Sequence, residues 1–578
     1  MVKLTKIERN IPAFIFEPKI GETTEKTVIK RQDNVLEIEF PIFEKNTVIE
    51  IAKNLSYKKR RAHNRDIEEV LEIIDQVGSL WADRNYDIRK EVMEILPLMT
   101  GESRELCEIE LSGTTELWKK NNAELQLKRE IGGKKYLEDW IEKGNSKLHA
   151  QPRGLVLHNM AGNAFNLGFL TLFYGLVSKN VNLVKLSHGE PYVIIKLCQS
   201  IMDVDKNIAK EIAALYWRGS SGEIYDELFN SGYIDAVIAW GGIYSIEEIR
   251  RRAYRFGIKV IDHGPKLSFS IISEELFQNP EKLNELIQKL AIDVACWNQK
   301  ACLSPRIIYI VDDPHKSAIN SNQRDTNLSR SNDLKVSDND SPANTLLNTF
   351  HKASETNDIL DFNMKTLMKR SIKLIRNNLS DISPVGFARL LADSLKRTDR
   401  ILPRANLTHT DGLEMTRKRE YFYMNYATKN RATIITPPNE KLDWTVVYLR
   451  DLPKKNEIDM CQNRFVIVTR VSNIRNLIHS IRQEQLKQYL QTISVYGSDE
   501  FIEEVAEEFS LLGAYRFPRV GEHNIHPIGM PWDGHYVIND LIKWVYIGFQ
   551  DYSNGKEGGR ISLFKDESFF QKSKRKRF

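Results

Sequence analysis

The chain has 578 residues, of which 41% are hydrophobic and 28% are charged, a balance typical of a globular protein with more than one core. The formal net charge is +5, and five of the seven residues at 572–578 are Lys or Arg. The rest of the chain is therefore neutral overall, which excludes a broadly basic nucleic-acid-binding surface.

The basic tail at 572–578 is interpreted as a solvated end, with docking to an acidic partner or polyanion as the alternative. The five cysteines, an odd number without zinc-site spacing, indicate reduced thiols. Residues 1–10 lack the apolar core of a signal peptide, and the most apolar stretch, 164–178, is too short to cross a bilayer. These features predict a cytoplasmic protein without a membrane span.

The first part of the chain has a helical pattern. Between about Arg65 and Ile141, apolar residues recur every three or four positions, as on one face of an amphipathic helix. No residue pattern in this stretch indicates chemistry. We therefore expect residues 1–150 to form a mainly helical lead-in.

Buried strands and helices then alternate, with strands expected at 154–158, 181–187, 234–240 and 259–262. A buried helix at 164–178 joins the first two strands, and a second helix lies between the last two. Ser245 is expected to cap this second helix, with Glu248 completing a capping box. The alternation predicts an α/β fold with a mostly parallel, doubly wound sheet.

A polar stretch directly before the apolar run 307–311 contains Cys302. A loop at the edge of a sheet can hold a thiol nucleophile rigidly and leave it accessible. Lys300 and Arg306 are cations that favour a thiolate. A free cysteine is more often a small buried hydrophobe, and Cys296, in an apolar setting, is interpreted in that way. Cys302 is therefore the candidate nucleophile.

Two polar residues lie near the ends of predicted strands. Asn163 can be a turn or N-cap residue, or an amide that donates to an oxyanion in a dry cleft. Lys185 can snorkel to solvent or bind ribose hydroxyls or a phosphate, and both interpretations stay open. Open α/β sheets bind ligands at the carboxyl ends of their strands, and this position favours the oxyanion role for Asn163.

Gly241 and Gly242 precede the helix that Ser245 is expected to cap, and they would let the backbone approach a pyrophosphate at a helix N-terminus. The pair is not a GxGxxG fingerprint, so alone it is a weak signal. His523 and His526 are interpreted as turn histidines, because His-x-x-His on a loop lacks the constraint of a metal site. No metal is expected.

Taken in order, several short motifs resemble those of the fatty-acyl-CoA reductases of bacterial luminescence and their non-luminescent relatives, the LuxC type, within the aldehyde dehydrogenase superfamily. The resemblance covers most of the chain from about Pro152 to Ile547, apart from residues 312–358. That segment is rich in Ser, Asn, Asp and Lys and is interpreted as a flexible insertion. The best motifs are Gln299–Pro305, Ala239–Gly242, Leu490–Thr492, Pro531–Gly534 and Leu541–Val545.

The resemblance implies an aldehyde dehydrogenase-like fold in which residues 1–150 are part of the cofactor-binding domain. It also implies a Rossmann-like NADP(H)-binding domain at 151–265, an α/β catalytic domain at 266–515, and a segment at 516–571 that returns to the cofactor and oligomerisation region. The implied activity is NADPH-dependent reduction of a fatty acyl-CoA or acyl-protein thioester to the aldehyde. The resemblance also implies a partner, either an acyl-protein synthetase or a carrier protein, and a homo-oligomeric state.

The site residues that the resemblance implies fall into two groups. The catalytic residues are Cys302, which would carry the acyl group, and Asn163, the amide of the oxyanion hole. The cofactor-binding residues are Lys185, Ser187, Gly241, Gly242 and Ser245.

Two positions depart from the pattern of relatives. Asp262 stands where hydrolytic aldehyde dehydrogenases carry a water-activating glutamate, and it is one methylene shorter, which suits a reductase. Trp532 stands where relatives commonly have histidine. The alternatives to a reductase are an aldehyde dehydrogenase working in the oxidative direction and a catalytically silent subunit that binds partners through the insertion and the tail.

Overall fold

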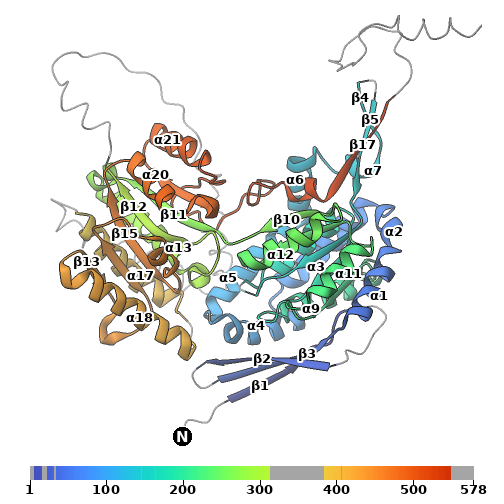
Figure 1. Ribbon diagram of the computed structural model, residues 1–578, viewed down its shortest axis with the longest axis horizontal. Coiled ribbons are helices and arrows are strands. Elements are labelled where there is room, and N and C mark those ends of the chain that lie inside the picture. Colours follow the sequence, from blue (N-terminus) through green and yellow to red (C-terminus); the bar gives the residue numbers. More distant parts are fainter. Residues whose placement is uncertain are drawn as a thin grey trace, which may run out of the picture.

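The computed structural model describes residues 5–15, 23–31, 34–144, 146–162, 164–312, 383–404 and 407–548. These residues form two α/β units, each built on a largely parallel sheet, together with a small antiparallel arm (Figure 1). The predicted α/β fold class is confirmed. The predicted insertion from residue 313 onward, the basic tail and Asn163 lie outside the described residues.

The first unit contains the strands β6 (Leu155–Asn159), β7 (Val181–Lys185), β8 (Ile212–Leu215), β9 (Ala236–Trp240) and β10 (Lys259–His263). They form a parallel sheet in the order β10-β9-β6-β7-β8. Every residue of β6, β7 and β9 is buried, which explains why these strands are continuous apolar runs in the sequence. The strand order reverses between β6 and β9, where sheets of this kind bind ligands.

Helices cover this sheet on both faces. The ones that connect its strands are α8 (Leu167–Val177), α9 (Val193–Val204), α10 (Lys206–Ala209), α11 (Gly222–Asn230) and α12 (Ile243–Tyr254). Those that precede it are α1 (Lys45–Ser56), α2 (Lys59–His63), α3 (Ile67–Ala82), α4 (Asp87–Thr100), α5 (Arg104–Thr115), α6 (Lys120–Ile131) and α7 (Lys135–Glu138). The apolar stripe of α3 packs into the core that α8 and α9 share.

An N-terminal sheet, absent from the sequence-based expectation, lies beside these helices (Figure 1). Its strands are β1 (Thr5–Asn10), β2 (Thr23–Arg31) and β3 (Asn34–Ile42), in the order β1-β3-β2. Main-chain bonds between Phe14 and Ala214 tie the segment after β1 to β8 of the first unit.

The second unit contains β11 (Leu267–Ser273), β12 (Pro305–Val311), β13 (Ala432–Ile435), β14 (Thr445–Leu449), β15 (Phe465–Val471) and β16 (Leu490–Tyr496). They form a sheet in the order β13-β14-β15-β12-β11-β16, in which β13 alone is antiparallel to its neighbour. On one face lie α13 (Pro280–Ala295) and α17 (Pro384–Ile401). On the other lie α18 (His409–Asn425), α20 (Ile474–Gln483) and α21 (Asp499–Ser510), and the short α19 (Lys455–Asp459) joins β14 to β15.

The C-terminal segment returns to the first unit. Helix α22 (Val537–Asp540) packs against α6, and β17 (Ile542–Gly548) pairs antiparallel with β5 (Ser146–Pro152), which pairs with β4 (Ile141–Lys143). The remaining elements are the short 3-10 helices η1 (Glu116–Trp118), η2 (Glu274–Gln278), η3 (Cys296–Gln299), η5 (Ala427–Lys429), η6 (Pro438–Glu440) and η7 (Lys487–Tyr489).

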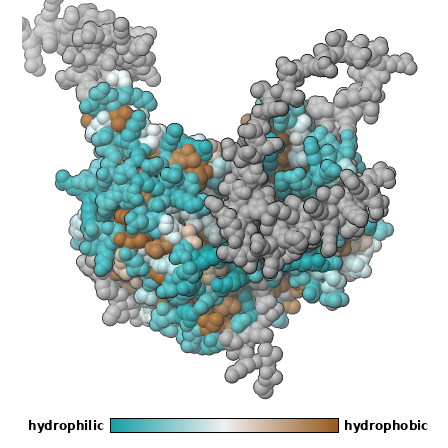
Figure 2. All heavy atoms as spheres, turned by 180° about the vertical axis from the view of Figure 1, so that it is seen from behind, coloured by the Kyte–Doolittle hydropathy of each residue, from teal (hydrophilic) through white to brown (hydrophobic). Residues whose placement is uncertain are grey.

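One face of the molecule is polar for the most part where its residues are described (Figure 2). Figure 2 shows one face on which hydrophobic residues form small separate groups among hydrophilic ones. Within the described ranges, no helix combines the length and apolar character needed to cross a membrane.

Candidate active site

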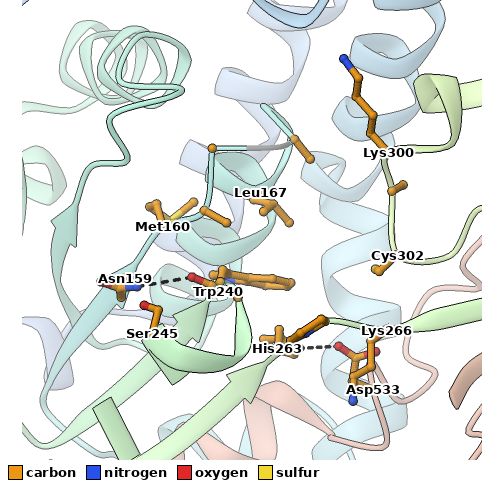
Figure 3. Close-up of a pocket in the computed structure, with 18 of the residues that line it drawn as sticks. Asn159, Met160, Leu167, Trp240, Ser245, His263, Lys266, Lys300, Cys302 and Asp533 are labelled. Atoms are coloured by element: carbon orange, nitrogen blue, oxygen red, sulfur yellow. Dashed lines mark hydrogen bonds and ion pairs between the residues drawn. The ribbon is translucent and has the colours of Figure 1, made fainter. Parts of the chain in front are cut away.

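A pocket of about 980 Å³ lies between the two units (Figure 3). Asn159, Lys185 and Trp240, at the carboxyl ends of β6, β7 and β9, form its wall on the side of the first unit. Cys302, in the loop before β12, forms part of the opposite wall. A cofactor bound along the first unit can therefore meet a group that the second unit holds.

The loop that carries Cys302 bends sharply before the cysteine. Trp297, Asn298 and Gln299 have consecutive φ values of 54°, 45° and 59°, in the left-handed region that costs non-glycine residues energy. The N–H of Trp297 donates to the Glu110 carboxylate at 2.9 Å, and the Gln299 amide donates to the carbonyl of residue 305 at 2.8 Å. These buried bonds hold the turn in its strained form.

Asn298 is also held by the start of β15. The N–H of Asn463 donates to the Asn298 carbonyl at 2.8 Å, and Arg464 Nε donates to its side-chain oxygen at 2.9 Å. Asn463 and Arg464 themselves have φ values of 64° and 58°. Arg464 is fully buried and pairs with Asp399 at 2.9 Å. Two strained segments thus fix each other and set the position of the Cys302 loop.

Cys302 is half-buried and lines the pocket, whereas the other four cysteines are buried. Gln491 Nε2 donates to its sulfur at 3.4 Å, and Ser268 Oγ donates to its carbonyl at 2.8 Å. Burial and then the charge of Asp533 raise the pKa of the thiol to about 11, against the lowering effect of Gln491 and Lys266. A thiolate at this position therefore needs stabilisation from the groups around it.

The prediction that Lys300 and Arg306 favour the thiolate is wrong. Lys300 points away from Cys302, and its ammonium donates to a main-chain carbonyl at 2.8 Å (Figure 3). Arg306 lines the pocket, but its guanidinium lies 3.9 Å from Asp459 and is not among the groups that lower the pKa of Cys302. Lys266, from the loop after β10, lowers the pKa of Cys302, and Arg516 also interacts with the thiolate.

His263 and Asp533 form a buried pair on the same wall. His263 Nδ1 lies 2.8 Å from Asp533 Oδ2, and the His263 ring stacks on Trp240 with 3.9 Å between ring centres (Figure 3). The other oxygen of Asp533 accepts a hydrogen bond from Gln491. Burial alone would raise the pKa of Asp533, but His263, Lys266 and the Gln491 amide hold it below its usual value.

Asp262 does not face the pocket. Its carboxylate accepts two hydrogen bonds from Arg250 of α12, at 3.0 and 2.6 Å, whereas the next residue of β10, His263, lines the pocket. Successive residues of a strand point to opposite faces of the sheet. The Asp262 side chain is therefore directed away from the pocket by its position on the strand.

The side chains of His523 and His526 form hydrogen bonds that hold the turns of the C-terminal segment. His523 Nδ1 donates to the Leu303 carbonyl at 2.7 Å, its Nε2 lies 2.7 Å from Ser494 Oγ, and burial lowers its pKa to about 3. His526 Nε2 donates to a main-chain oxygen at 3.1 Å, and its ring contacts Trp532. Across the ranges that the structure describes, no three His, Cys, Asp or Glu side chains are grouped to hold a metal ion.

Lys185 lies in the pocket wall at the end of β7. The residue is 8% exposed, its ammonium lies 5.5 Å from the centre of the Tyr216 ring, and burial lowers its pKa to about 8. A buried lysine that opens onto a pocket suits a ribose or phosphate ligand. Ser187 is half-buried two residues later, and a Cβ on Gly162 of the pocket wall would meet its Oγ at 2.6 Å.

The predicted capping of α12 is wrong. Gly242 is the N-cap, and Ser245 lies inside the first turn, so no capping box forms. Glu248 pairs with Arg251 on the same helix. Gly241, Gly242 and Ser245 nevertheless all line the pocket, and a Cβ on Gly242 would point into open space. The helix N-terminus is therefore uncovered toward the pocket, which suits an anionic ligand.

Three residues of the site were not predicted as functional: His263 and Asp533, which line the pocket, and Gln491, which contacts the Cys302 sulfur. Gln491 and Asp533 fall within motifs of the family resemblance, but nothing local indicates that β16 and residue 533 meet Cys302. The predicted oxyanion residue Asn163 lies outside the described residues, and its neighbours Gly162 and Ala164 line the pocket.

The two units and the pocket between them define the aldehyde dehydrogenase fold. An aldehyde dehydrogenase from Physcomitrella patens matches with a TM-score of 0.63 at 11% identity, over 95% of this chain and 100% of that chain. An NADP-dependent glyceraldehyde-3-phosphate dehydrogenase from Bacillus halodurans matches with a TM-score of 0.61 at 13% identity, over 93% of this chain and 98% of that chain. The predicted aldehyde dehydrogenase-like fold is confirmed.

Within that fold, the chain belongs to the acyl-CoA reductase (LuxC) family, which matches residues 62–321 and 373–544. The predicted family is confirmed. The long-chain acyl-protein thioester reductase of Vibrio harveyi is 27% identical over 297 residues, which are 50% of this chain and 60% of the relative. That of Photorhabdus luminescens is 28% identical over 246 residues, 42% of this chain and 50% of the relative. The chain thus spans about half the length of the curated relatives it matches.

Proposed function

We propose that the protein reduces a fatty acyl thioester to the aldehyde with NADPH, through an acyl group carried on Cys302. The observation that supports this most strongly is the shared pocket, which Cys302 lines together with Lys185 and Gly242. A thiol on a fixed loop can take an acyl group, and a cofactor along the first unit can reach the same space.

The acylation step consumes a thiolate on Cys302. Its sulfur attacks the thioester carbonyl, the new C–S bond forms, and the C–S bond of the donor breaks. The departing thiolate takes up one proton, which balances the one that Cys302 released. The Cys302 N–H and the Asn163 amide are the proposed donors to the oxyanion.

The reduction step releases the aldehyde. When bound, NADPH supplies a hydride to the acyl carbon. The hemithioacetal anion on Cys302 then collapses, so that the carbonyl forms again, the C–S bond breaks and the cysteine returns as a thiolate. The proposed cofactor contacts are Lys185, Ser187, Gly241, Gly242 and Ser245, all in the first unit.

The pocket disfavours hydrolysis of the acyl group. Asp262, at the position of the water-activating glutamate, is engaged with Arg250 away from the pocket. Asp533, which does line the pocket, is occupied by His263 and Gln491. A water molecule near the acyl group would therefore find both of these carboxylates engaged, which favours hydride transfer over hydrolysis.

The acyl donor is proposed to be an acyl-CoA or an acyl-protein thioester. Two curated relatives carry the name long-chain acyl-protein thioester reductase, which favours a protein-bound donor. An acyl-protein synthetase or carrier protein as partner, a homo-oligomer and a cytoplasmic location remain predictions.

The test is a two-stage experiment with the full chain. Incubation with a long-chain acyl-CoA, or with an acyl-carrier thioester, should add one acyl mass to the peptide that contains Cys302. Addition of NADPH should then remove this mass and yield aldehyde. Free acid formed faster from aldehyde and NADP⁺ would favour the oxidative alternative, and absence of any label would favour the silent subunit.

Lys185→Met is expected to weaken NADPH binding about tenfold, because a charge-assisted contact is lost. The pKa of Lys185 is lowered to about 8, so its positive charge is present below that pH and is lost as the pH rises through it. Wild-type affinity should therefore fall about tenfold between pH 7 and pH 9, measured by NADPH fluorescence titration. The variant should lack this slope.

Lys206→Met is the matched control, since Lys206 is an exposed lysine at the start of α10 in the same unit. It should keep both the affinity and the pH slope. If NADPH affinity depended on pH equally in wild type and in Lys185→Met, Lys185 would not contact the cofactor.

A further inference from the structure

Gln491 lies on β16 with its amide between a carboxylate and the Cys302 sulfur. Its Nε2 donates to Asp533 Oδ1 and lies 3.4 Å from Cys302 Sγ, and Ser268 Oγ lies 3.4 Å from its Oε1. Gln491 is only 5% exposed, so solvent competes little for these bonds. The amide thus connects the reacting sulfur to the buried His263–Asp533 pair.

Chemistry fixes which end of this amide faces the sulfur. Asp533 is ionised, because its pKa is held below the usual value, and a carboxylate only accepts hydrogen bonds. It therefore faces the NH₂ group of Gln491, and the amide oxygen lies on the side of Ser268, 3.4 Å from its Oγ. One N–H of the NH₂ group serves Asp533, and the second is left for the sulfur of Cys302.

We propose that Gln491 is a catalytic residue whose amide N–H stabilises negative charge on Cys302 Sγ, and that Asp533, held by His263, orients this amide. The inference rests on the proposed role of Cys302 as the acylated nucleophile. Sulfur carries negative charge twice in each cycle, when the nucleophile forms and when the hemithioacetal releases it. The same N–H therefore assists both steps, since hydrogen bonds to ionised groups are the stronger ones.

The amide also shields the thiolate from a neighbouring charge. Asp533 raises the pKa of the Cys302 thiol, whereas Gln491 and Lys266 lower it. Other titratable groups surround the pair: Arg516 interacts with both Cys302 and Asp533, His526 interacts with Asp533, and the ring of His535 lies 6.2 Å from that of His263. His263 is thus a positioning residue: its bond to Asp533 and its stacking on Trp240 keep the carboxylate turned toward Gln491.

The test measures the reactivity of Cys302 without acyl donor or cofactor. Iodoacetamide alkylation is followed by intact mass from pH 7 to pH 10, with Cys302→Ala as the blank. Gln491→Met keeps the volume and removes the donor, so its alkylation rate at pH 8 should fall about tenfold, as the thiol pKa rises. Gln491→Glu keeps the shape but adds a like charge, and its rate should fall further.

Gln488→Met is the matched control, because Gln488 is an exposed glutamine three positions before Gln491. It should alkylate like wild type at every pH. A Gln491→Met variant that unfolds at the wild-type temperature and shows an unchanged pH profile of alkylation would overturn the inference. If Gln491→Met does not fold, an unchanged alkylation profile in Gln491→Glu would overturn it. Thioester reduction that persists in Cys302→Ala would instead overturn the proposed function, because alkylation needs no turnover.

Discussion

Replacement of Cys302 by alanine is expected to abolish thioester reduction, with a loss of about 10⁴-fold or more in kcat/KM. The reason is that Cys302 is the single cysteine, among the residues the structure describes, that opens onto the pocket. The measurements are NADPH oxidation with a panel of acyl thioesters and the acyl mass on the protein. Both signals should disappear together.

The control is Cys296→Ala. Cys296 is 4% exposed, and burial raises the pKa of its thiol well above the usual value, so it is a packing residue at the base of the same loop. This variant should keep the acyl label and lose about 1–2 kcal/mol in the free energy of unfolding. Persistent turnover in Cys302→Ala would exclude Cys302 as the acyl carrier.

Arg464→Met is expected to lower the free energy of unfolding by about 3 kcal/mol. Methionine fills much of the same space, but Asp399 loses its cation and the strained Asn298 loses a donor. The Cys302 loop should become mobile, so acylation should also slow. Denaturant unfolding measures the first effect, and the rate of acyl-mass gain measures the second.

Arg470→Met provides the comparison on the same strand, β15. Its side chain is 44% exposed, and the guanidinium pairs with Asp312 and Glu274 at the surface. Exposed ion pairs contribute little, so the free energy of unfolding should change by no more than about 0.5 kcal/mol. Equal stability of the two variants would show that the buried pair does not hold the loop.

The first unit was the part of the fold most readily predicted from sequence. Its strands β6, β7 and β9 are buried on both faces, so each is a short apolar run bounded by turns. The N-terminal sheet escaped prediction because seven of the nine residues of β2 are charged or polar, and most of its side chains are at least partly exposed. Strands of this kind give little apolar signal.

The candidate site also contains residues that could be predicted from the sequence and residues that could not. Cys302 could be predicted because a polar loop before a buried strand is a local pattern. Gln491 could not, because it lies 189 positions from the cysteine it contacts. The cap of α12 was misplaced because Gly242 and Ser245 are both acceptable N-cap residues, and propensity alone does not choose between them.

The alternation of side chains along β10 has a consequence for redesign. Substitution of glutamate for Asp262 would lengthen a side chain that already faces Arg250, on the side of the strand away from the pocket. A hydrolytic base would have to enter at position 263, where it would break the contact with Asp533. Conversion to a hydrolase at this position would therefore remove the His263–Asp533 contact that orients Gln491 toward Cys302. Hydrolysis and reduction thus make opposing demands on residue 263.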